Sequence, residues 1–327
     1  MPYKYKRVDF DSLASSWDQL QEASSSAPIF SSRSWTSIWW RHFGHSYSNY
    51  LGEISSDGKT LGIVPLALNN DTAQFIGSEN VCDYLDFVIS KGYEDIFFRT
   101  LINHLVSEGI GRLDLLPVRE GSTVMTSLLA LCQQSGLSIS VNAFDVSPYL
   151  DLPSKWETYL SSLEKKQRHE LRRKLRRLDE HGNLRFNRFT TISEDQMSTF
   201  LKLFRDSRGD KELFMTSEME SFFRDICSSL AGLGYLRLNV LEINASQIAH
   251  TISFDYHNQR LLYNSGFDRT YGWLSAGLIS KALCVKESIE EGKERFDFLR
   301  GNEEYKYHLG AVGCPVYRCT VLLTNKI

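Results

Sequence analysis

Three strand-like segments follow one another closely in the second half of the chain, and an amphipathic helix and a further strand come directly after them. Short polar turns join the first three strands, which favours antiparallel pairing between them. A strand-helix-strand unit then completes the series, so the sequence predicts an α/β (α+β) fold with a mixed, partly antiparallel sheet flanked by helices. The predicted segments are strands Tyr235–Ile243, Gln247–Tyr256 and Arg260–Phe267, helix Leu274–Glu290 and strand Arg295–Phe298.

The first half of the chain shows a similar alternation of strands and helices. Two apolar runs, Tyr50–Ile54 and Leu61–Leu68, flank a Ser-Ser-Asp-Gly-Lys turn and predict a hairpin. A chain of 327 residues has the length of two ordinary domains. We therefore predict a first domain over residues 1–150 and a second over 151–327. Helices are expected over Ser34–Phe43, Asp95–Glu108, Thr123–Ser135, Leu152–His181, Glu194–Ser207 and Ser217–Leu230, and a last strand over Val316–Thr324.

Composition excludes several classes of protein. Hydrophobic residues make up 42% of the chain, which excludes a disordered protein. No apolar stretch approaches the roughly 20 residues of a membrane-spanning helix, and the start of the chain lacks the apolar core of a signal peptide. The six cysteines are scattered without CxxC pairs, a pattern typical of reduced thiols. We expect a cytoplasmic protein without a transmembrane segment or a metal site.

A basic run over Lys165–Arg177 stands out in a chain whose net charge is −3. Such a concentrated positive charge predicts a local anionic partner rather than general binding to DNA. At helical spacing, three leucines of this region form one apolar seam, with Arg168 and Arg172 beside it. These two arginines are candidates for gripping phosphates. The alternative is an ordinary solvated helix face.

A second group of candidates lies near the C-terminal end, in FDFLRGNEEYKYHLG. Asp297 lies between two phenylalanines of a strand, where a carboxylate could orient or deprotonate an attacking amine. Tyr305 could protonate a leaving thiolate, and Arg300 and Lys306 could bind the substrate. A structural ion pair that locks the turn explains the same residues equally well.

Three further polar residues interrupt apolar segments. Asp83 and Asp86, in DYLD, could bind sugar hydroxyls or an ammonium group, although ordinary turn chemistry explains them too. His250 lies in the middle of a predicted strand and is a secondary candidate for a general base. A lone strand histidine is more often a hydrogen-bonded structural residue.

Five ordered stretches carry a resemblance that covers nearly the whole chain. Together they resemble the CelD/BcsL-type acyltransferases, which belong to the GNAT superfamily and are related to the Fem aminoacyltransferases. The resemblance implies two tandem GNAT-like domains and acyl transfer to an amine or hydroxyl. The stretches are FSSRSWTSIWWRHFG, DYLDFVI, LEKKQRHELRRKLRRLDEHG, YNSGFDRTYGWLSAGL and RFDFLRGNEEYKYHLG.

The resemblance also implies where an acyl donor would bind. In a GNAT-like domain, the strand with Asn264 and Gly266 offers backbone groups to the donor arm. The N-terminus of the next helix then faces the donor phosphates, and Ser275, Ala276 and Gly277 are small enough for close approach. Simple N-capping by Ser275 is the alternative.

These observations lead to one main function and two alternatives. The main prediction is a GNAT-type N-acyltransferase that moves an acyl group from acyl-CoA, with acetyl-CoA as the first choice. The acceptor would be a small molecule or glycan, such as an amino sugar or a polysaccharide precursor. The usual glycine-rich CoA loop is missing, so a Fem-like transferase using aminoacyl-tRNA is one alternative. The other is a non-catalytic module that docks on an anionic surface, such as RNA or a membrane, through residues 165–177.

Overall fold

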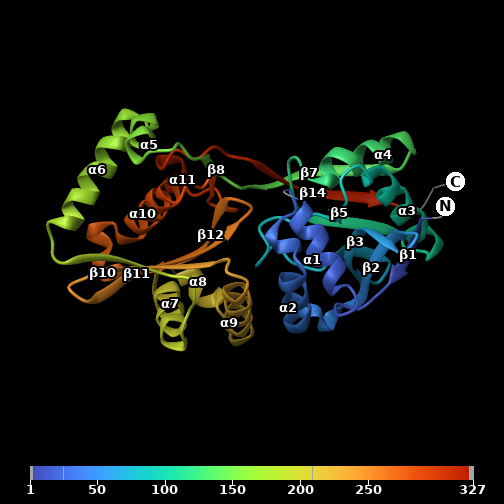
Figure 1. Cartoon of the computed structure of the whole chain (residues 1–327), viewed down its shortest axis with the longest axis horizontal. Coiled ribbons are helices and arrows are strands. Elements are labelled where there is room, and N and C mark those ends of the chain that lie inside the picture. The colour runs from blue at the N-terminus through green and yellow to red at the C-terminus, as the bar shows by residue number, and fades with distance from the viewer. Residues whose placement is uncertain (1–2, 25, 208, 324–327) are drawn as a thin grey trace. The chain divides into compact units, whose positions relative to one another are not determined.

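The chain forms two compact units in this computed structural model, which describes residues 3–24, 26–207 and 209–323. The first unit combines Met1–Val146 with Cys314–Ile327, and the second is Ser147–Gly313. The predicted boundary near residue 150 lies close to the observed division. The prediction of a second domain that runs to residue 327 is wrong, because the last strand joins the first sheet. Each unit contains a mixed sheet with helices on both faces (Figure 1), which confirms the predicted fold class.

The first unit is built on a sheet whose strand order is β1-β2-β3-β4-β6-β14-β7, with β5 paired to β3. Its hairpin β2–β3 turns at Asp57 and Gly58, which both have the positive φ that such turns need. Strands β4 and β6 pair in parallel, and β14 lies antiparallel between β6 and β7. The strands are β1 (Lys4–Arg7), β2 (Ser48–Ser56), β3 (Lys59–Asn69), β4 (Thr72–Phe75), β5 (Val88–Ile89), β6 (Arg112–Arg119), β7 (Ser138–Val146) and β14 (Pro315–Leu322).

The helices of the first unit cover both faces of this sheet (Figure 1). Helix α2 begins after Ser32, whose side chain accepts a hydrogen bond from Trp35 N, so the helix starts one residue before the predicted Ser34. A π-helical turn, Val124–Leu128, leads into α4. The helices are α1 (Ala14–Ala23), α2 (Arg33–Phe43), α3 (Glu94–Ser107) and α4 (Leu129–Gln134).

Asp86 lies buried at the start of the π-helical turn and caps it. Its carboxylate accepts hydrogen bonds from Thr123 N at 2.7 Å and from Thr123 Oγ1 at 2.6 Å. Phe87 N donates to the same side chain at 2.9 Å. Burial raises the pKa of Asp86 to about 6, although the hydrogen bonds from Thr123 oppose that rise. This carboxylate is 4% exposed and already bonded, so the structure favours a structural role for Asp86, and its binding of a substrate stays a prediction.

The second unit contains a sheet with strand order β8-β13-β12-β11-β10-β9. Strands β10 to β12 form an antiparallel series, as predicted, and β9 extends it beside β10. Two-residue turns with positive φ join β10 to β11 and β11 to β12. Strand β13 pairs in parallel with β12 and antiparallel with β8. The strands are β8 (Tyr149–Asp151), β9 (Leu184–Phe189), β10 (Leu236–Ile243), β11 (Ser246–Tyr256), β12 (Gln259–Phe267) and β13 (Arg295–Asp297).

Helices pack on both faces of the second sheet. Helices α7 and α9 contact one face, and α10 contacts the other with α5 and α6 against its outer side. The predicted long helix over 152–181 is divided into two helices, α5 and α6, which are separated by Leu163 and Glu164. The helices are α5 (Trp156–Ser162), α6 (Lys165–Asp179), α7 (Glu194–Ser207), α8 (Gly209–Phe214), α9 (Ser217–Gly232), α10 (Ala276–Glu290) and α11 (Glu304–His308).

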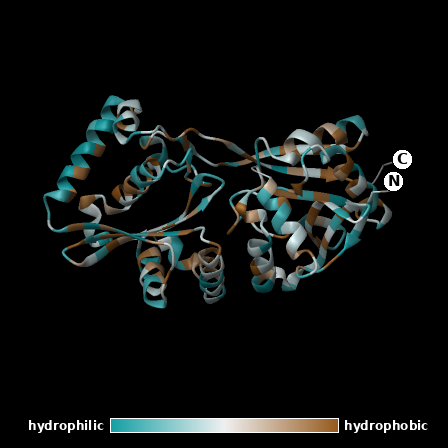
Figure 2. Ribbon diagram, in the orientation of Figure 1, coloured by the Kyte–Doolittle hydropathy of each residue, from teal (hydrophilic) through white to brown (hydrophobic). Residues whose placement is uncertain are grey.

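Helix α6 shows how the sequence pattern fixes an element. Leu171 and Leu178 are buried and Leu175 packs against the same core, which confirms the predicted apolar seam. The other faces are almost entirely polar, and Figure 2 shows the helix as hydrophilic with interrupted apolar patches. Packing of this single seam holds the basic helix to the core of the second unit.

We expect Asp86→Asn to destabilise the protein by about 2 to 3 kcal/mol, because it places an amide among the hydrogen-bond donors that now face a carboxylate. Urea denaturation measures this change in the free energy of unfolding. The matched control is Asp57→Asn, an exposed turn residue, which should change stability by less than about 0.5 kcal/mol. Equal stability of the two variants would contradict the capping role.

Candidate active site

The site begins where two parallel strands of the second sheet separate. Strands β12 and β13 pair only through Gln259↔Arg295, Arg260↔Phe296 and Leu261↔Asp297. Strand β13 then ends, whereas β12 continues to Phe267 and remains paired to β11. Residues 262–267 of β12 therefore have no partner strand on the β13 side among the described residues. Such an edge offers backbone N–H and C=O groups to a ligand.

A bulge marks the start of this free edge. Ile252 pairs with Asn264 and Ser253 pairs with Leu262, so Tyr263 is an extra residue on β12. Bulges of this kind bend a strand and commonly occur beside active sites. Further along the strand, Lys211 Nζ on α8 donates to the carbonyl oxygen of Ser265 at 2.7 Å. A polar side chain therefore already uses one acceptor of β12.

The free edge leads to the N-terminus of α10. Ser275 adopts the left-handed conformation, with φ 59° and ψ 37°, and its side chain caps no N–H group, so the alternative of simple N-capping does not hold. The N–H groups of Ala276 and Gly277 make no hydrogen bond to any described residue, although both residues are buried. Free N–H groups at a helix start attract an anion, and the helix dipole adds to this effect.

Tyr305 and Lys281 lie together beside this helix start. Lys281 Nζ donates to the carbonyl oxygen of Gly277 at 2.7 Å and lies 4.9 Å from the ring centroid of Tyr305 on α11. The side chain of Lys281 is 8% exposed. Burial, with a contribution from the charge of Lys211, lowers the pKa of Lys281 to about 7. The site therefore contains an amine that changes charge near neutral pH beside a phenol.

Lys306, which was predicted to bind the substrate, is buried and bonded to the loop after β13. Its Nζ donates to the carbonyl oxygens of Leu299, Arg300 and Gly301 at 2.9 to 3.0 Å, and Glu303 Oε2 lies 3.0 Å away. An ammonium group has three hydrogens, so these contacts saturate it. The geometry favours a role in fixing the loop after β13, and binding of substrate by Lys306 or Arg300 stays a prediction.

Asp297 is fully buried at the end of β13. Its Oδ1 accepts hydrogen bonds from Leu299 N at 2.8 Å and from the Ser147 hydroxyl at 3.3 Å. Leu299 has a positive φ of 58°, and the hydrogen bond from its N–H holds that strained turn. These hydrogen bonds, rather than the ion pair that was considered, give Asp297 a structural role at the turn, while its role in orienting the acceptor stays a prediction.

His250 is buried on β11, opposite Gly266 of β12. Its Nε2 lies 2.8 Å from Gln247 Oε1, and its Nδ1 makes no hydrogen bond to a described residue. Burial lowers the pKa of His250 to about 4. A group with so low a pKa is a weak base at neutral pH, so the structure favours the structural interpretation of this histidine.

Two of the predicted donor-binding glycines have packing roles. A Cβ atom on Gly266 would lie 2.3 Å from Phe204 N, so this glycine lets the backbone of α7 approach β12. A Cβ on Gly277 would lie 2.7 Å from the ring of Phe267. Asn264 is partly exposed on the free stretch of β12. A role for these backbones in binding a donor remains a prediction.

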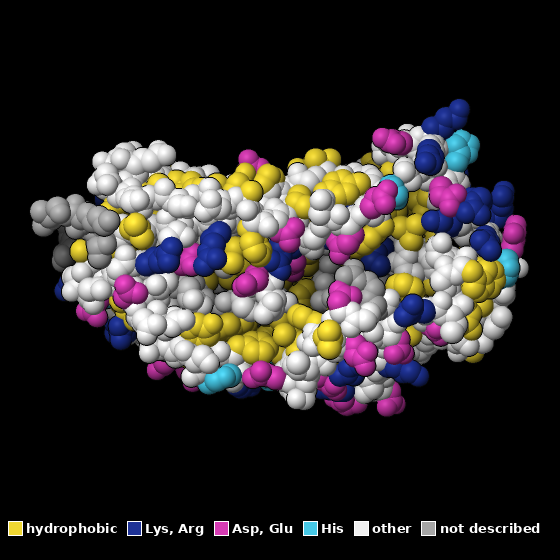
Figure 3. All heavy atoms as spheres, turned by 180° about the vertical axis from the view of Figure 1, so that it is seen from behind, with side chains coloured by type: hydrophobic (Ala, Val, Ile, Leu, Met, Phe, Trp, Pro, Cys, Tyr) yellow, Lys and Arg dark blue, Asp and Glu magenta, His cyan; other side chains and the backbone are white. Residues whose placement is uncertain are grey.

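The predicted phosphate-binding arginines lie on α6. Arg168 Nη1 donates to the carbonyl oxygen of Ser161 at 3.0 Å, and Arg172 Nη2 lies 3.3 Å from Glu157 Oε2. Arg177 instead lies over the exposed ring of Trp273, just before α10, at 5.1 Å. Figure 3 shows basic side chains gathered over the end of the molecule that carries α6. Asp83 is partly buried in the first unit.

Other kinds of site receive no support from the described residues. They contain no cluster of three or more potential metal ligands. None of their helices is both long and apolar enough to cross a membrane. All six cysteines are free thiols, and burial raises the pKa of Cys284, the one on α10, to about 12.

Comparison with known protein families finds a match within the second unit. Residues 165–307 match the protein family described as the acetyltransferase (GNAT) domain. The match lies within the second unit and includes β12, α10 and α11. The second unit thus carries the match to a GNAT acetyltransferase domain, and an acyltransferase is the class of enzyme that this match indicates. A search of curated protein sequences found no match.

Solved structures show the same tandem fold. FemX superposes with a TM-score of 0.66 at 11% identity, over 96% of each chain. The C-terminal domain of a putative lysylphosphatidylglycerol synthetase from Agrobacterium fabrum gives 0.59 at 11% identity, over 97% of this chain and 93% of that one. A tandem GNAT protein from the clavulanic acid biosynthesis pathway gives 0.51 at 12% identity, over the whole of both chains. At this identity, the likeness concerns the fold alone.

The sequence did not single out Lys281 or Lys211. Helix α10 is buried almost all round, and a lysine in such a helix is a signal that helical spacing alone could have revealed. Lys211 gave no such signal, because α8 was not predicted and the hydrogen bond to Ser265 joins segments 54 residues apart.

The pKa of Lys281 predicts a pH dependence of stability. The pKa is about 7 in the folded protein and 10.5 as the ordinary value, so the unfolded chain binds the extra proton between these values. The free energy of unfolding should therefore rise with pH across this window, by up to about 1.4 kcal/mol per pH unit.

Lys281→Met keeps the shape of the side chain and removes its charge. Urea denaturation at pH 7, 8 and 9 should show that the variant lacks the additional rise seen in the wild type. Parallel pH profiles for the two proteins would contradict the assignment of a neutralised, buried amine.

Proposed function

We propose that the protein transfers an acyl group from acyl-CoA, acetyl-CoA in the first place, to the amine or hydroxyl of an acceptor. The acceptor nitrogen or oxygen attacks the donor carbonyl directly, without a covalent enzyme intermediate. The amide or ester bond forms as the carbon-sulfur bond breaks, and the proton of the nucleophile finally resides on the leaving thiol. We place this activity in the cytoplasm.

One observation carries the proposal: the free edge of β12 leads directly to an uncapped helix N-terminus. The free N–H groups of Ala276 and Gly277 suit the phosphates of a donor such as CoA. The unpaired edge of residues 262–267 suits an extended arm that bears amide groups. The two features follow each other along the chain, as do the phosphates and the amide-bearing arm along CoA.

Tyr305 and Lys281 supply the chemistry expected at the acyl end. We assign Tyr305 as the acid that protonates the leaving thiolate. The ammonium form of Lys281, which lies against the Tyr305 ring, stabilises the phenolate that remains. Asp297 holds the turn between β13 and α11 through Leu299, and so it positions the helix that carries Tyr305.

The proposed acceptor is an amino sugar or a polysaccharide precursor of the cell envelope. Its support is the resemblance of the five ordered stretches to CelD/BcsL-type acyltransferases. Arg300 on the loop after β13 is the candidate contact for such an acceptor.

A second candidate function uses an aminoacyl-tRNA as donor. The observation that favours it is the basic helix α6 with Arg177 stacked on the exposed Trp273, directly before the start of α10. Basic side chains beside an exposed aromatic ring bind single-stranded nucleic acid through phosphates and base stacking. Arg168 and Arg172 would contribute in the same way.

The test measures the affinity of the full chain for acetyl-CoA by isothermal titration calorimetry. Asp and Asn both tolerate the left-handed conformation of Ser275, so Ser275→Asp and Ser275→Asn form a matched pair. The added carboxylate of Ser275→Asp should repel donor phosphates and weaken binding by about tenfold or more, whereas Ser275→Asn should bind nearly as the wild type does.

Equal affinity of the two variants for acetyl-CoA would contradict the proposal that the donor phosphates bind at the N-terminus of α10. A thermal shift assay with charged tRNA separates the two donors, since a ligand that binds the native state raises its melting temperature. Stabilisation by charged tRNA and not by acetyl-CoA would replace the main proposal with the second candidate.

A further inference from the structure

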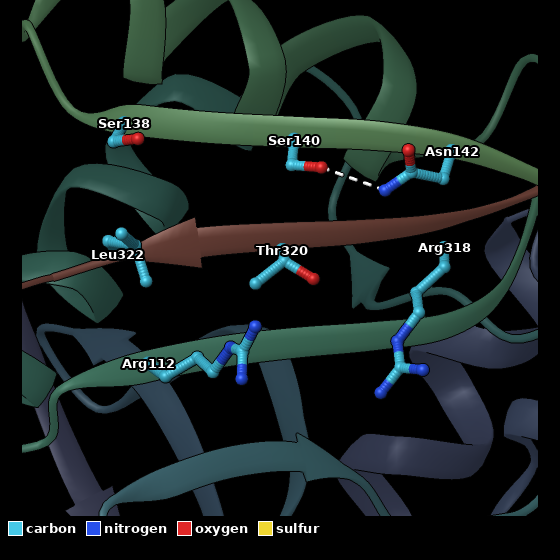
Figure 4. Close-up of a pocket in the computed structure, with 7 residues that line it drawn as sticks. All are labelled: Arg112, Ser138, Ser140, Asn142, Arg318, Thr320 and Leu322. Atoms are coloured by element: carbon cyan, nitrogen blue, oxygen red, sulfur yellow. Dashed lines mark hydrogen bonds between the residues drawn. The ribbon is translucent and has the colours of Figure 1, made fainter.

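A polar hollow lies on the first unit, in a part of the chain that the proposed donor site does not use. Its volume is about 360 Å³. Strand β14 lies along its middle, and the neighbouring strands β6 and β7 form its two walls. Side chains alternate along each strand, so every second residue projects from the same face (Figure 4). The lining residues are Arg112, Ser138, Ser140, Asn142, Arg318, Thr320 and Leu322.

One of its two arginines is fixed by neighbouring groups. Arg318 Nε donates to Asp114 Oδ1 at 2.9 Å, and Thr320 Oγ1 donates to the same oxygen at 3.1 Å. Burial of Asp114 opposes its ionisation, yet the hydrogen bond and charge of Arg318 hold its pKa below the ordinary value. The carboxylate therefore stays charged and holds the Arg318 guanidinium in place.

The other arginine lies at the β6 wall and is not paired in this way. Arg112 is exposed, and its guanidinium forms no hydrogen bond or ion pair at contact distance with any described residue, although its charge acts on Asp114 from further away. Arg318 is paired with Asp114 and also lies within electrostatic reach of Glu79. Arg112 is therefore the lining cation whose side chain is left for a ligand, and a single such cation suits one anionic group rather than a polyphosphate.

The β7 wall is uncharged and consists of hydroxyl and amide groups. Asn142 Nδ2 donates to Ser140 Oγ at 2.8 Å. This leaves the Ser140 hydroxyl proton and the Asn142 carbonyl oxygen available to a ligand. The Ser138 hydroxyl adds a further donor and acceptor. Such groups recognise ligand hydroxyls in both hydrogen-bonding directions.

Dimensions and composition narrow the class of ligand. Adjacent strands lie about 4.8 Å apart, so the β6 and β7 walls are separated by roughly 10 Å. The volume is at the low end of the range for small-molecule sites and accommodates one or two sugar rings. Leu322 is the apolar side chain among the lining residues, which excludes a lipid or a flat aromatic ligand. The outward face of an antiparallel sheet is often merely solvated, and that is the competing explanation.

We propose that this hollow binds a carbohydrate that carries a single anionic group, either a carboxylate or a phosphate monoester. The anionic group pairs with Arg112, and the ring hydroxyls bond to Ser140 and Asn142 on the opposite wall. This site is independent of the donor site, so it stands or falls separately from the proposed acyl transfer.

The test is an NMR titration of the full, ¹⁵N-labelled chain with D-glucuronate, glucose 6-phosphate, glucose and acetate. Glucuronate or glucose 6-phosphate should shift the amide signals of Ser138–Asn142 and Arg318–Leu322 at millimolar concentration. The arm that binds more tightly identifies the anion as a carboxylate or a phosphate. Glucose lacks the charge and acetate lacks the hydroxyls, so each should bind at least about fivefold more weakly.

Two variants and one control complete the experiment. Arg112→Gln should weaken binding of the charged sugar by at least about fivefold, and Ser140→Ala should weaken its binding but not that of acetate. Arg99→Gln, an exposed arginine on α3, should leave binding unchanged. The proposal is overturned if no localised shifts occur up to roughly 50 mM, if glucose binds as tightly as the charged sugars, or if Arg112→Gln binds normally.

Discussion

The buried guanidinium of Arg260 is the interaction on which the second unit depends. Arg260 on β12 is fully buried and bonds to Asp255 on β11 at 2.7 Å. It also lies 2.9 Å from Glu287 on α10 and 2.7 Å from Glu291, just past the helix end. One side chain therefore ties two strands to the C-terminal half of the helix. Removing one partner of such a buried network leaves uncompensated charges, which is strongly destabilising.

This network also explains where the site opens. Arg260 lies in the short stretch where β12 and β13 still pair, and the network anchors α10 at that end. The opposite end of α10, its N-terminus, follows Ser275 and comes shortly after the stretch of β12 that has no partner strand. A firmly held helix with a free N-terminus is thus placed against an open strand edge. Anchoring at one end allows unsatisfied backbone groups to persist at the other.

The first unit contains a similar pair of separating parallel strands, but there another segment of the chain bonds to the free strand edge. Strands β4 and β6 pair in parallel only over Thr72–Gln74, as β12 and β13 do over three residues. Beyond that point, Leu85 N donates to the carbonyl oxygen of Pro117 on β6. The segment that contains DYLD therefore occupies the free edge, and Asp86 caps the π-helical turn nearby. Among the described residues of these two strand pairs, the edge of β12 in the second unit is the one that stays open.

Much of the architecture was readable from the sequence. The predicted strands β10 to β12 agree with the structure to within one residue, because alternating apolar runs and polar turns are local signals. The leucine seam of α6 was equally clear. The partner strands of β14 were not predicted, because its pairing with β6 and β7 joins residues far apart in sequence. The predicted end of that strand, Thr324, lies outside the described residues.

The candidate site was harder to predict than the fold. The sequence pointed to the start of α10, where the structure has a left-handed Ser275 and two free N–H groups, and donor binding there stays a prediction. It assigned Gly266 to donor binding, because nothing local shows that α7 packs against that glycine. It proposed Asp86 as a ligand contact, because its capping of Thr123 depends on a contact 37 residues away. Long-range packing decides these roles.

Amide hydrogen exchange with and without a CoA thioester tests the central claim most directly. If the free edge of β12 holds the donor, acetyl-CoA should slow exchange at amides within residues 262–267 and at Ala276 and Gly277. Exchange in β6 of the first unit, whose corresponding edge Leu85 already occupies, should not change. Unchanged exchange in β12 and α10 at saturating acetyl-CoA, or protection confined to the first unit, would contradict the account.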